Sequence, residues 1–143
     1  MKVRDLMTTP AIQISPEETV AVAARTLTHY NIGVLPVCAQ DGRLQGLVTD
    51  RDLVTRCMAA DRPVGQMTVA EVMTGRVISV SPDMEAGVAA HLMGRQQVRR
   101  LPVVENGRLC GMVSLGDLAR REQSVMDAAD ALGDISTNLS EGE

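Results

Sequence analysis

Hydrophobic and polar positions follow the same order twice along the chain. Alternation over residues 11–14, and again over residues 77–80, predicts two short half-buried strands. Apolar runs over residues 34–38 and 98–104 predict strands that are buried more fully. Each half of the chain therefore predicts the order strand, helix, two strands and a second helix.

A helix is expected between the first and second strand of each half. Ser15-Pro16-Glu17-Glu18 combines a capping serine, a proline at the first helical position and a glutamate at the third, and Ser81-Pro82-Asp83 repeats most of this signal. Asn31 and Gly33 are typical of the end of the first helix. Helical spacing predicts these core-facing residues: Val20, Ala23, Ala24 and Leu27 in the first helix, and Val88, Ala89, Leu92 and Met93 in the second.

Two tight turns are expected, at Asp41-Gly42 and Asn106-Gly107, because these dipeptides favour hairpins. A strand follows each turn, over residues 44–48 and 109–113, and leads into a helix.

The repetition extends to the residues themselves. The segment 3–8 returns as 69–74 and the segment 46–53 returns as 111–118, about 66 residues later. Two copies are too few for an open solenoid, so we expect two similar units about a pseudo-twofold axis, with a ligand cleft between them. The predicted fold is α/β: two tandem β-α-β-β-α repeats in one compact module.

The repeat suggests the following division of the chain. Residues 1–60 form the first repeat, residues 61–68 a linker with Pro63 and Gly65 as breakers, and residues 69–122 the second repeat. Residues 123–143 form a C-terminal helix and a mobile acidic tail. The helix is expected over residues 124–132, with the tail from Asp134 to Glu143. Four residues are expected to face inward from this helix: Val125, Ala128, Ala129 and Leu132.

Composition narrows the possible partners. The chain has 143 residues and a formal net charge of -4, which gives no bulk attraction to nucleic acid or to an anionic membrane. The sequence shows no signal-peptide pattern and no apolar run of the roughly 18 residues that span a membrane. We therefore expect a cytoplasmic protein that binds neither. With one Tyr and no Phe or Trp, a flat ligand ring must lie between aliphatic side chains.

The three cysteines, Cys38, Cys57 and Cys110, are odd in number and form no Cys-x-x-Cys. This pattern is typical of reduced thiols, and we expect Cys38 and Cys110 to be inert residues of strands. No ligand spacing joins the cysteines to His29 or His91, so we expect no metal site.

One motif that carries chemistry occurs in both repeats: Gly-hydrophobic-hydrophobic-Thr/Ser-x-x-Asp. It places Thr49 and Asp52, and likewise Ser114 and Asp117, where a strand ends and a helix begins. The structural interpretation is a helix capping box. The functional interpretation is a ligand site, because a helix start and its hydroxyl attract phosphate and a nearby carboxylate can accept hydrogen bonds from a ribose diol. Duplication of the whole context favours function.

Together, the Met-Thr near each start, the Ser-Pro, the Leu-Pro-Val, the Asp-Gly or Asn-Gly, and this motif resemble a pair of CBS domains, the cystathionine β-synthase type, also called a Bateman module. The resemblance covers about residues 3–121. It implies a disk-like α/β body with two interdomain clefts. It also implies binding of adenosyl ligands such as AMP, ADP, ATP or S-adenosylmethionine.

By position, the resemblance implies that Asp52 and Asp117 hold two riboses and that Thr49 and Ser114 meet phosphate. The family often has a basic residue before its Leu-Pro, and Arg99-Arg100 fills that place in the second repeat. The first repeat has Gly33-Val34 there, so only Arg51 offers a cation. The alternative for these arginines is a solvated position. The implied adenine slots are lined by Ile12, Val77 and Ile78, with Leu35, Pro36, Leu101 and Pro102 nearby.

No Ser-His-Asp or Cys-His arrangement and no lysine-bearing phosphate loop is readable, so we expect no enzyme activity and no required cofactor. The resemblance implies a stand-alone regulator that senses AMP, ADP or ATP, and hence energy state, and acts through an unknown regulated protein or its own dimer. Homodimerisation is expected through the helices that open at Pro16, Asp50, Pro82 and Leu115. The alternative is an interaction module with empty or structural clefts.

Overall fold

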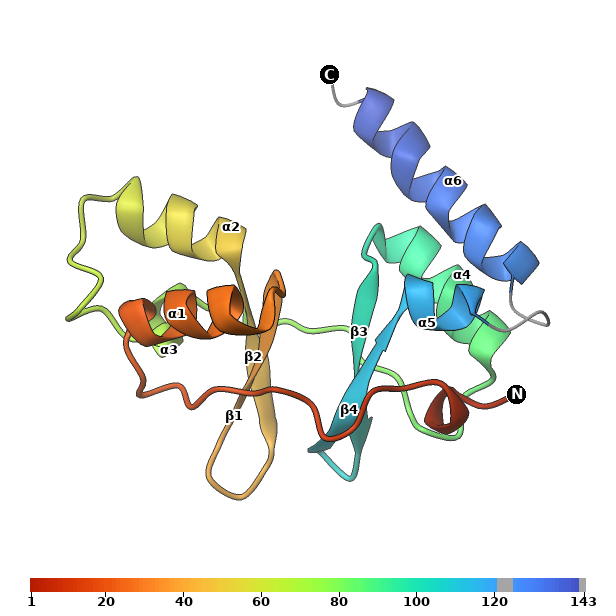
Figure 1. Ribbon diagram of the computed structural model, residues 1–143, viewed down its shortest axis with the longest axis horizontal. Helices are drawn as coiled ribbons and strands as arrows, with labels where there is room; N and C mark the ends of the chain where they lie inside the picture. The colour runs from red at the N-terminus through yellow and green to blue at the C-terminus, as the bar shows by residue number, and fades with distance from the viewer. Residues whose placement is uncertain (121–124, 142–143) are drawn as a thin grey trace. The chain divides into compact units, whose positions relative to one another are not determined.

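The computed structural model describes residues 1–120 and 125–141 of the chain (Figure 1). These residues pack as two compact units. The repeat-1 unit contains Ile12–Val77 and Gly107–Leu109, and the repeat-2 unit contains Met1–Ala11, Ile78–Asn106 and the chain from Cys110 onward. The N-terminal segment thus belongs to the unit of the second repeat. Each unit is described by itself below.

The repeat-1 unit packs its helices on a two-stranded antiparallel sheet (Figure 1). Its elements are α1 (Val20–Tyr30), β1 (Val34–Cys38), β2 (Leu44–Thr49), α2 (Asp50–Leu53) with a π-helical continuation η2 (Val54–Met58), and α3 (Val69–Val72). The core consists of aliphatic side chains and one thiol, and its fully buried members include Leu35, Val37, Val48 and Cys57.

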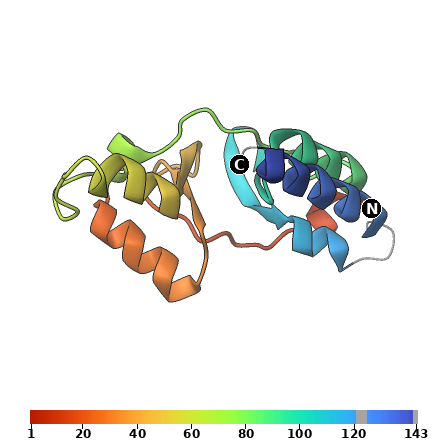
Figure 2. The ribbon, with the colours of Figure 1, turned by 90° about the horizontal axis from the view of Figure 1, so that it is seen from above.

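The repeat-2 unit has the corresponding hairpin and one additional long helix. Its elements are the short 3-10 helix η1 (Val3–Asp5), α4 (Ala86–Gln96), β3 (Arg100–Glu105), β4 (Arg108–Ser114), α5 (Leu115–Ala119) and α6 (Val125–Glu141). Figure 2 shows α6 lying beside α4, and the two helices are in contact. The side chains of Ala128, Ala131 and Ile135 on α6 are buried in this core. No helix among the described residues has the length and apolarity needed to cross a membrane.

The hairpins agree with the sequence expectations. Gly42, Asn106 and Gly107 adopt the positive φ angles that tight turns require, at 90°, 54° and 78°. Asn31 ends α1 in the left-handed conformation, as the sequence predicts. The predicted α/β fold with two repeats is confirmed.

The expected strands over residues 11–14 and 77–80 are wrong. Only Ile14 and Val80 form single parallel bridges, to Val37 and Val103. The ladder stops because the next hydrogen bond would need an N–H from Pro36 or Pro102, and proline has none. The prolines of the two Leu-Pro-Val elements therefore limit each strand to one residue pair.

The expected helix starts at Pro16 and Pro82 are also wrong. Helix α1 begins at Val20, where the Thr19 hydroxyl accepts a hydrogen bond from the Val22 N–H at 3.2 Å, and α4 begins at Ala86. The Ser-Pro segments form turns instead, because other segments bind their carbonyls. Pro16 O accepts from the Ala70 N–H at 3.0 Å, and Pro82 O accepts in the same way from Arg4.

The buried faces of α1 and α4 differ from the expected ones. Val20, Ala23 and Leu27 are buried on α1, whereas Ala24 is exposed. On α4, Ala89 and Met93 are buried and Leu92 is half-buried, but the Val88 side chain is 52% exposed. The buried face of α4 instead includes Ala90 and Gly94, and Gly94 lies against Ala131 of α6.

Helix α6 is longer than the sequence predicts. It continues to Glu141, so the expectation of a tail from Asp134 is wrong for residues 134–141. The reason is that the apolar stripe of Ala128 and Ala131 continues to Ile135, one turn further on. Ala128 faces inward as expected, whereas Ala129 and Leu132 are exposed on the helix. Ser124, the side chain of Val125 and residues 142–143 lie outside the described residues.

Each unit is closed by a Met-Thr segment that crosses a glycine of the sheet. Thr8 exchanges two backbone hydrogen bonds with Met112, at 2.8 and 3.1 Å, and Thr74 does so with Leu47, at 2.8 and 3.0 Å. The preceding glycines, Gly111 and Gly46, leave room for this crossing. The Met-Thr elements and the first glycine of the Gly-h-h-Thr/Ser-x-x-Asp motif thus have a structural role.

Candidate functional site

The Thr/Ser-x-x-Asp sequences form complete capping boxes in both units. The Asp52 N–H donates to Thr49 Oγ1 at 3.1 Å, and the Thr49 N–H donates to Asp52 Oδ2 at 3.0 Å. The corresponding distances between Ser114 and Asp117 are 3.0 and 2.8 Å. The structural interpretation of the motif therefore holds, and it leaves the hydroxyl hydrogen of each Thr or Ser available to donate.

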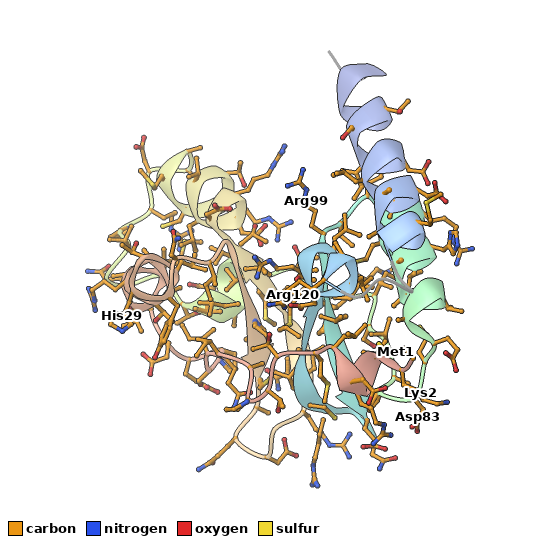
Figure 3. The ribbon with its side chains drawn as sticks, turned by 45° about the vertical axis from the view of Figure 1, so that its right-hand side comes forward. Met1, Lys2, His29, Asp83, Arg99 and Arg120 are labelled. Carbon is orange, nitrogen blue, oxygen red and sulfur yellow. The ribbon has the colours of Figure 1, made fainter. Side chains whose placement is uncertain are left out.

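The second oxygen of each aspartate faces an arginine that the sequence analysis did not single out. Arg56 Nε lies 3.9 Å from Asp52 Oδ1, and Arg120 pairs with Asp117 Oδ1. Both carboxylates are buried, so these arginines balance charges that are otherwise costly to desolvate. Arg56 follows Asp52 by four residues and Arg120 follows Asp117 by three, and side chains at these spacings meet on a helix surface. This spacing could have predicted both pairs from the sequence. Figure 3 labels Arg120 at the end of α5.

A cavity of about 470 Å³ lies in the repeat-2 unit beside one of these capping boxes. Arg99 and Arg100 contribute one wall where β3 begins, and Ser114, Leu115 and Gly116 contribute another where α5 begins. The two walls are tied together, because the Leu115 N–H donates to Arg99 O at 2.8 Å. Figure 3 labels Arg99 just before β3.

The remaining wall comes from α5 and α6 and is aliphatic. Its members are Ala119, Ala128, Ala129 and Leu132. The apolar spacing on α6 was visible in the sequence, but its place beside Arg99 and Ser114 was not. The cavity therefore combines two cations and a hydroxyl with a smooth apolar surface. Asp117 lies directly behind Ser114 and is not part of the lining.

The first repeat brings Thr49, Arg51 and Asp52 together at the start of α2, but with a different neighbour. Gly33 O accepts from the Asp50 N–H at 3.2 Å, which makes Gly33 the counterpart of Arg99 and Asp50 the counterpart of Leu115. The Asp50 carboxylate lies about 3.6 Å from where a Cβ on Gly33 would be. The first repeat thus has the Asp50 carboxylate near the place where the second repeat has Arg99 and Arg100. This negative charge disfavours binding of an anion in the first repeat.

The residues expected near an adenine ring lie in different environments. Leu35 and Leu101 belong to the two cores, with 0% and 2% of their surface exposed. Pro36 and Pro102 are buried, and their carbonyls accept the N–H groups of Ile14 and Val80. Three more residues have exposed surface: Ile12 and Val77, which are half-buried, and Ile78, which is exposed. Among the described residues, no three acidic, His or Cys side chains gather as a metal site would require.

The capping boxes should contribute to stability whether or not a ligand binds. We expect Thr49→Ala and Ser114→Ala each to lower the free energy of unfolding by about 1 kcal/mol, because each leaves an N–H at a helix start unpaired. Urea denaturation measures this. Thr28→Ala, at an exposed position of α1, is the control and should change stability by less than about 0.5 kcal/mol. Equal effects at the three positions would contradict the capping role.

Cys38, Cys57 and Cys110 are in no disulfide, as expected, and Cys38 is buried in β1. Burial raises the pKa of the Cys38 thiol from 9.0 to about 11. Because the folded state holds this proton more tightly than the unfolded chain, the stability that the thiol contributes is complete below pH 9.0 and is lost as the pH rises toward about 11. Urea midpoints should therefore fall more steeply over this range in the wild type than in Cys38→Ala. Parallel curves would show that Cys38 titrates normally.

Comparison with known proteins decides the family. The CBS domain family matches residues 3–59 and 69–124. The chain belongs to the CBS domain family. The CBS domain-containing protein YhcV of Bacillus subtilis is 42% identical over 134 residues, which cover 94% of each chain.

Solved CBS structures agree with this assignment. The crystal structure of Hypoxic Response Protein I with two coordinated zinc ions has a TM-score of 0.78 and 33% identity, and the match covers 85% of this chain and 98% of that one. The CBS domain pair of MJ0100, in complex with 5'-methylthioadenosine and S-adenosyl-L-methionine, has a TM-score of 0.73 and 28% identity, with 84% and 94% covered. The present chain is accordingly a CBS domain pair, a regulatory module.

Proposed function

We propose that this CBS domain pair is a sensor of adenine nucleotides and that the cavity beside Arg99, Arg100 and Ser114 is its principal binding site. The observation that carries the proposal is the pairing of two arginines with a capping hydroxyl on one side and an aliphatic wall on the other. Guanidinium groups make charge-assisted hydrogen bonds to phosphate. The aliphatic wall suits a purine ring in a chain with one aromatic residue.

The charge of the cavity discriminates between adenosyl ligands. The MJ0100 domain pair was crystallised with 5'-methylthioadenosine and S-adenosyl-L-methionine, which shows that a related CBS pair accepts the adenosyl group. S-adenosylmethionine carries a sulfonium cation, which two arginines repel, whereas AMP, ADP and ATP carry phosphate. We therefore propose AMP, ADP or ATP as the ligand, with S-adenosylmethionine binding more weakly. Cysteines outside disulfides fit a reducing compartment such as the cytoplasm.

Calorimetric titration of the full chain with AMP, ADP, ATP, adenosine and S-adenosylmethionine tests the proposal. The three nucleotides should bind more tightly than the two ligands that lack phosphate. A nucleotide at about one hundred times its Kd should also raise the free energy of unfolding by about 2.7 kcal/mol. If no nucleotide binds at millimolar concentration, the alternative function applies, which is an interaction module whose cavities are structural.

We further propose that the module forms a homodimer through the α2–η2 helix and transmits its ligand state through that dimer or through a regulated protein. Val54 and Met58 lie one helical turn apart on this helix and are 52% and 61% exposed. Sedimentation of the wild type at micromolar concentration should give a dimer, and Val54→Lys with Met58→Lys should give a monomer. A monomeric wild type would contradict the proposal.

A further inference from the structure

A second cavity lies in the repeat-1 unit, at the end of the hairpin that is remote from the capping box. Its volume is about 540 Å³, within the range of small-molecule sites. Three glutamine side chains line it, from Gln13, Gln40 and Gln45, together with Ser15 and Glu17. The lining residues include no lysine or arginine. Its chemistry is therefore opposite to that of the nucleotide cavity, with one carboxylate and several amides.

The Glu17 carboxylate is held as an anion. The Ser15 hydroxyl donates to Glu17 Oε2, and this hydrogen bond lowers the pKa of the carboxyl group. Among the described residues, Glu17 forms no ion pair. Glu17 is exposed at the wall of this polar cavity and has no cation partner among the described residues, so an external cation can reach it.

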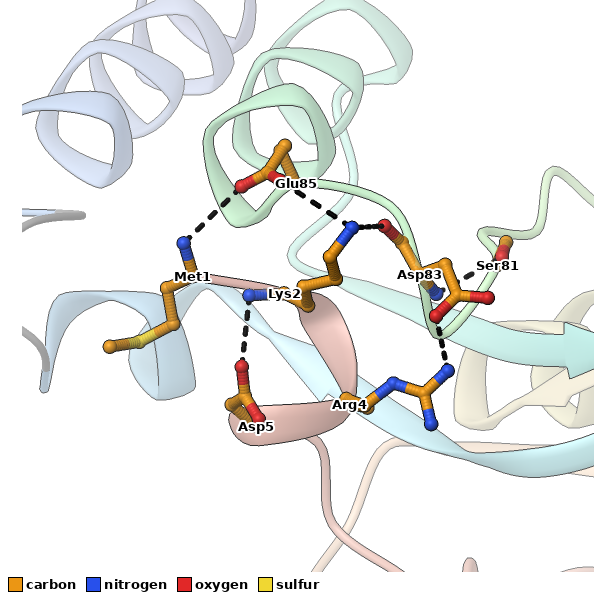
Figure 4. A network of polar contacts seen from close by, with 7 residues as sticks. All are labelled: Met1, Lys2, Arg4, Asp5, Ser81, Asp83 and Glu85. Atoms are coloured by element: carbon orange, nitrogen blue, oxygen red, sulfur yellow. Dashed lines mark hydrogen bonds and ion pairs between the residues drawn. The ribbon is translucent and has the colours of Figure 1, made fainter.

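In the repeat-2 unit, the carboxylate at the position that corresponds to Glu17 has a cation as its partner. Asp83 is the counterpart of Glu17, and the guanidinium of Arg4 pairs with it (Figure 4). Glu105, the counterpart of the cavity residue Ala39, adds to the negative field that raises the pKa of Arg4. In the repeat-2 unit, the carboxylate that corresponds to Glu17 therefore already has an arginine as its partner, and both side chains are exposed.

The repeat-1 unit has the same backbone there but lacks the arginine. The Arg4 N–H donates to Pro82 O at 3.0 Å, and the Ala70 N–H donates to Pro16 O at the same distance. The preceding backbone hydrogen bonds also correspond. The Val3 N–H donates to Met84 O at 2.9 Å, and the Val69 N–H donates to Glu18 O at 2.8 Å. Ala70 thus stands at the place of Arg4, and its exposed side chain ends at Cβ.

We propose that the cavity at Glu17 binds a small organic cation, whose guanidinium or ammonium group pairs with Glu17 as Arg4 pairs with Asp83. The amides of Gln13, Gln40 and Gln45 bind the polar remainder of the ligand, since an amide can both donate and accept hydrogen bonds. The CBS pair then has two sites of opposite charge preference, one for an anionic nucleotide and one for a cationic metabolite such as a basic amino acid or its amine.

The test is a titration of the full chain with L-arginine, followed by NMR of the glutamine side-chain amides. L-citrulline is the matched control ligand, because it has the shape of arginine without the charge. Arginine should give saturable shifts at Gln13, Gln40 and Gln45, and citrulline should bind about two- to fivefold more weakly. No saturable shift, or equal binding of the two ligands, would overturn the proposal.

Two variants and one control locate the interaction. Glu17→Gln should weaken arginine binding by about two- to fivefold. Ala70→Arg should abolish it, because the new side chain can pair with Glu17 as Arg4 pairs with Asp83. Glu18→Gln removes the same charge one residue away, outside the lining, and should have no effect. Equal loss in Glu17→Gln and Glu18→Gln, or full binding in Ala70→Arg, would also overturn the proposal. Nucleotide binding should be unchanged in all three, so this test is independent of the proposed function.

Discussion

Replacing Gly111 with alanine is expected to lower the free energy of unfolding by about 1–3 kcal/mol, the usual cost of forcing atoms into a packed site. A Cβ at this position would lie 2.6 Å from the carbonyl oxygen of Thr8. That oxygen cannot move away freely, because it accepts the Met112 N–H while the Thr8 N–H donates back to Met112. The substitution must therefore separate the N-terminal segment from β4. The gain from a less flexible unfolded chain, at most about 1 kcal/mol, opposes this only in part.

Urea denaturation of three glycine variants checks this expectation. Gly46→Ala should behave like Gly111→Ala, because its Cβ would lie 2.5 Å from Thr74 O. Gly65→Ala is the matched control, since nothing lies within 4 Å of its Cβ position and its φ is not positive. The control should be neutral or slightly stabilising. If Gly111→Ala were as stable as the control, the segment crossing would not require glycine.

Replacing Arg99 and Arg100 together with methionine is expected to weaken AMP binding by about tenfold or more, because both charge-assisted contacts to phosphate are lost. Methionine retains much of the aliphatic length, so the apolar part of the wall is preserved. Adenosine has no phosphate, and its affinity should change little. A comparison of AMP with adenosine therefore distinguishes the loss of the arginine charges from a change in the shape of the cavity.

Arg95→Met is the control for this pair. Arg95 is exposed on α4 and is not part of the cavity lining, so the variant makes the same kind of charge change at a distance. Calorimetry should show near wild-type AMP binding in Arg95→Met. The affinity of the wild type for AMP should also fall as salt is raised, more than that of the Arg99–Arg100 double variant. Equal AMP affinity in the wild type and the double variant would show that these arginines do not bind the phosphate.

The sequence predicts those parts of the candidate site that are formed by residues close together in the chain. The strand end, the capping residue and the aspartate of Ser114–Asp117 lie within one turn, so their spacing determines the capping box. The position of Arg99 beside Ser114 follows from the hairpin, whose turn at Asn106-Gly107 is legible in the sequence. The pairing of Asp117 with Arg120 is equally local and was overlooked.

The rest depends on contacts between segments far apart in the sequence. The Ser-Pro pairs satisfy the local rules for a helix start, yet α1 and α4 begin later because Ala70 and Arg4 bind the proline carbonyls from distant segments. Spacing alone also could not show that α6 passes Asp134 and continues to Glu141, because this depends on the burial of Ile135 in the core of the repeat-2 unit. In both cases tertiary packing overrides a local preference.

The sequence by itself determined the two repeats, their hairpins and capping boxes, and the family, because these depend on residues within a few positions of one another and on their duplication. Only the tertiary structure assigned Met1–Ala11 to the repeat-2 unit and placed the aliphatic face of α6 beside Arg99 and Ser114. It alone showed that Arg4 compensates Asp83 while Glu17 has no such partner in the described part of the chain. The physical reason is that a cavity and its charge are set by which distant side chains pack together, and repeats with nearly the same local pattern can differ there by a single residue.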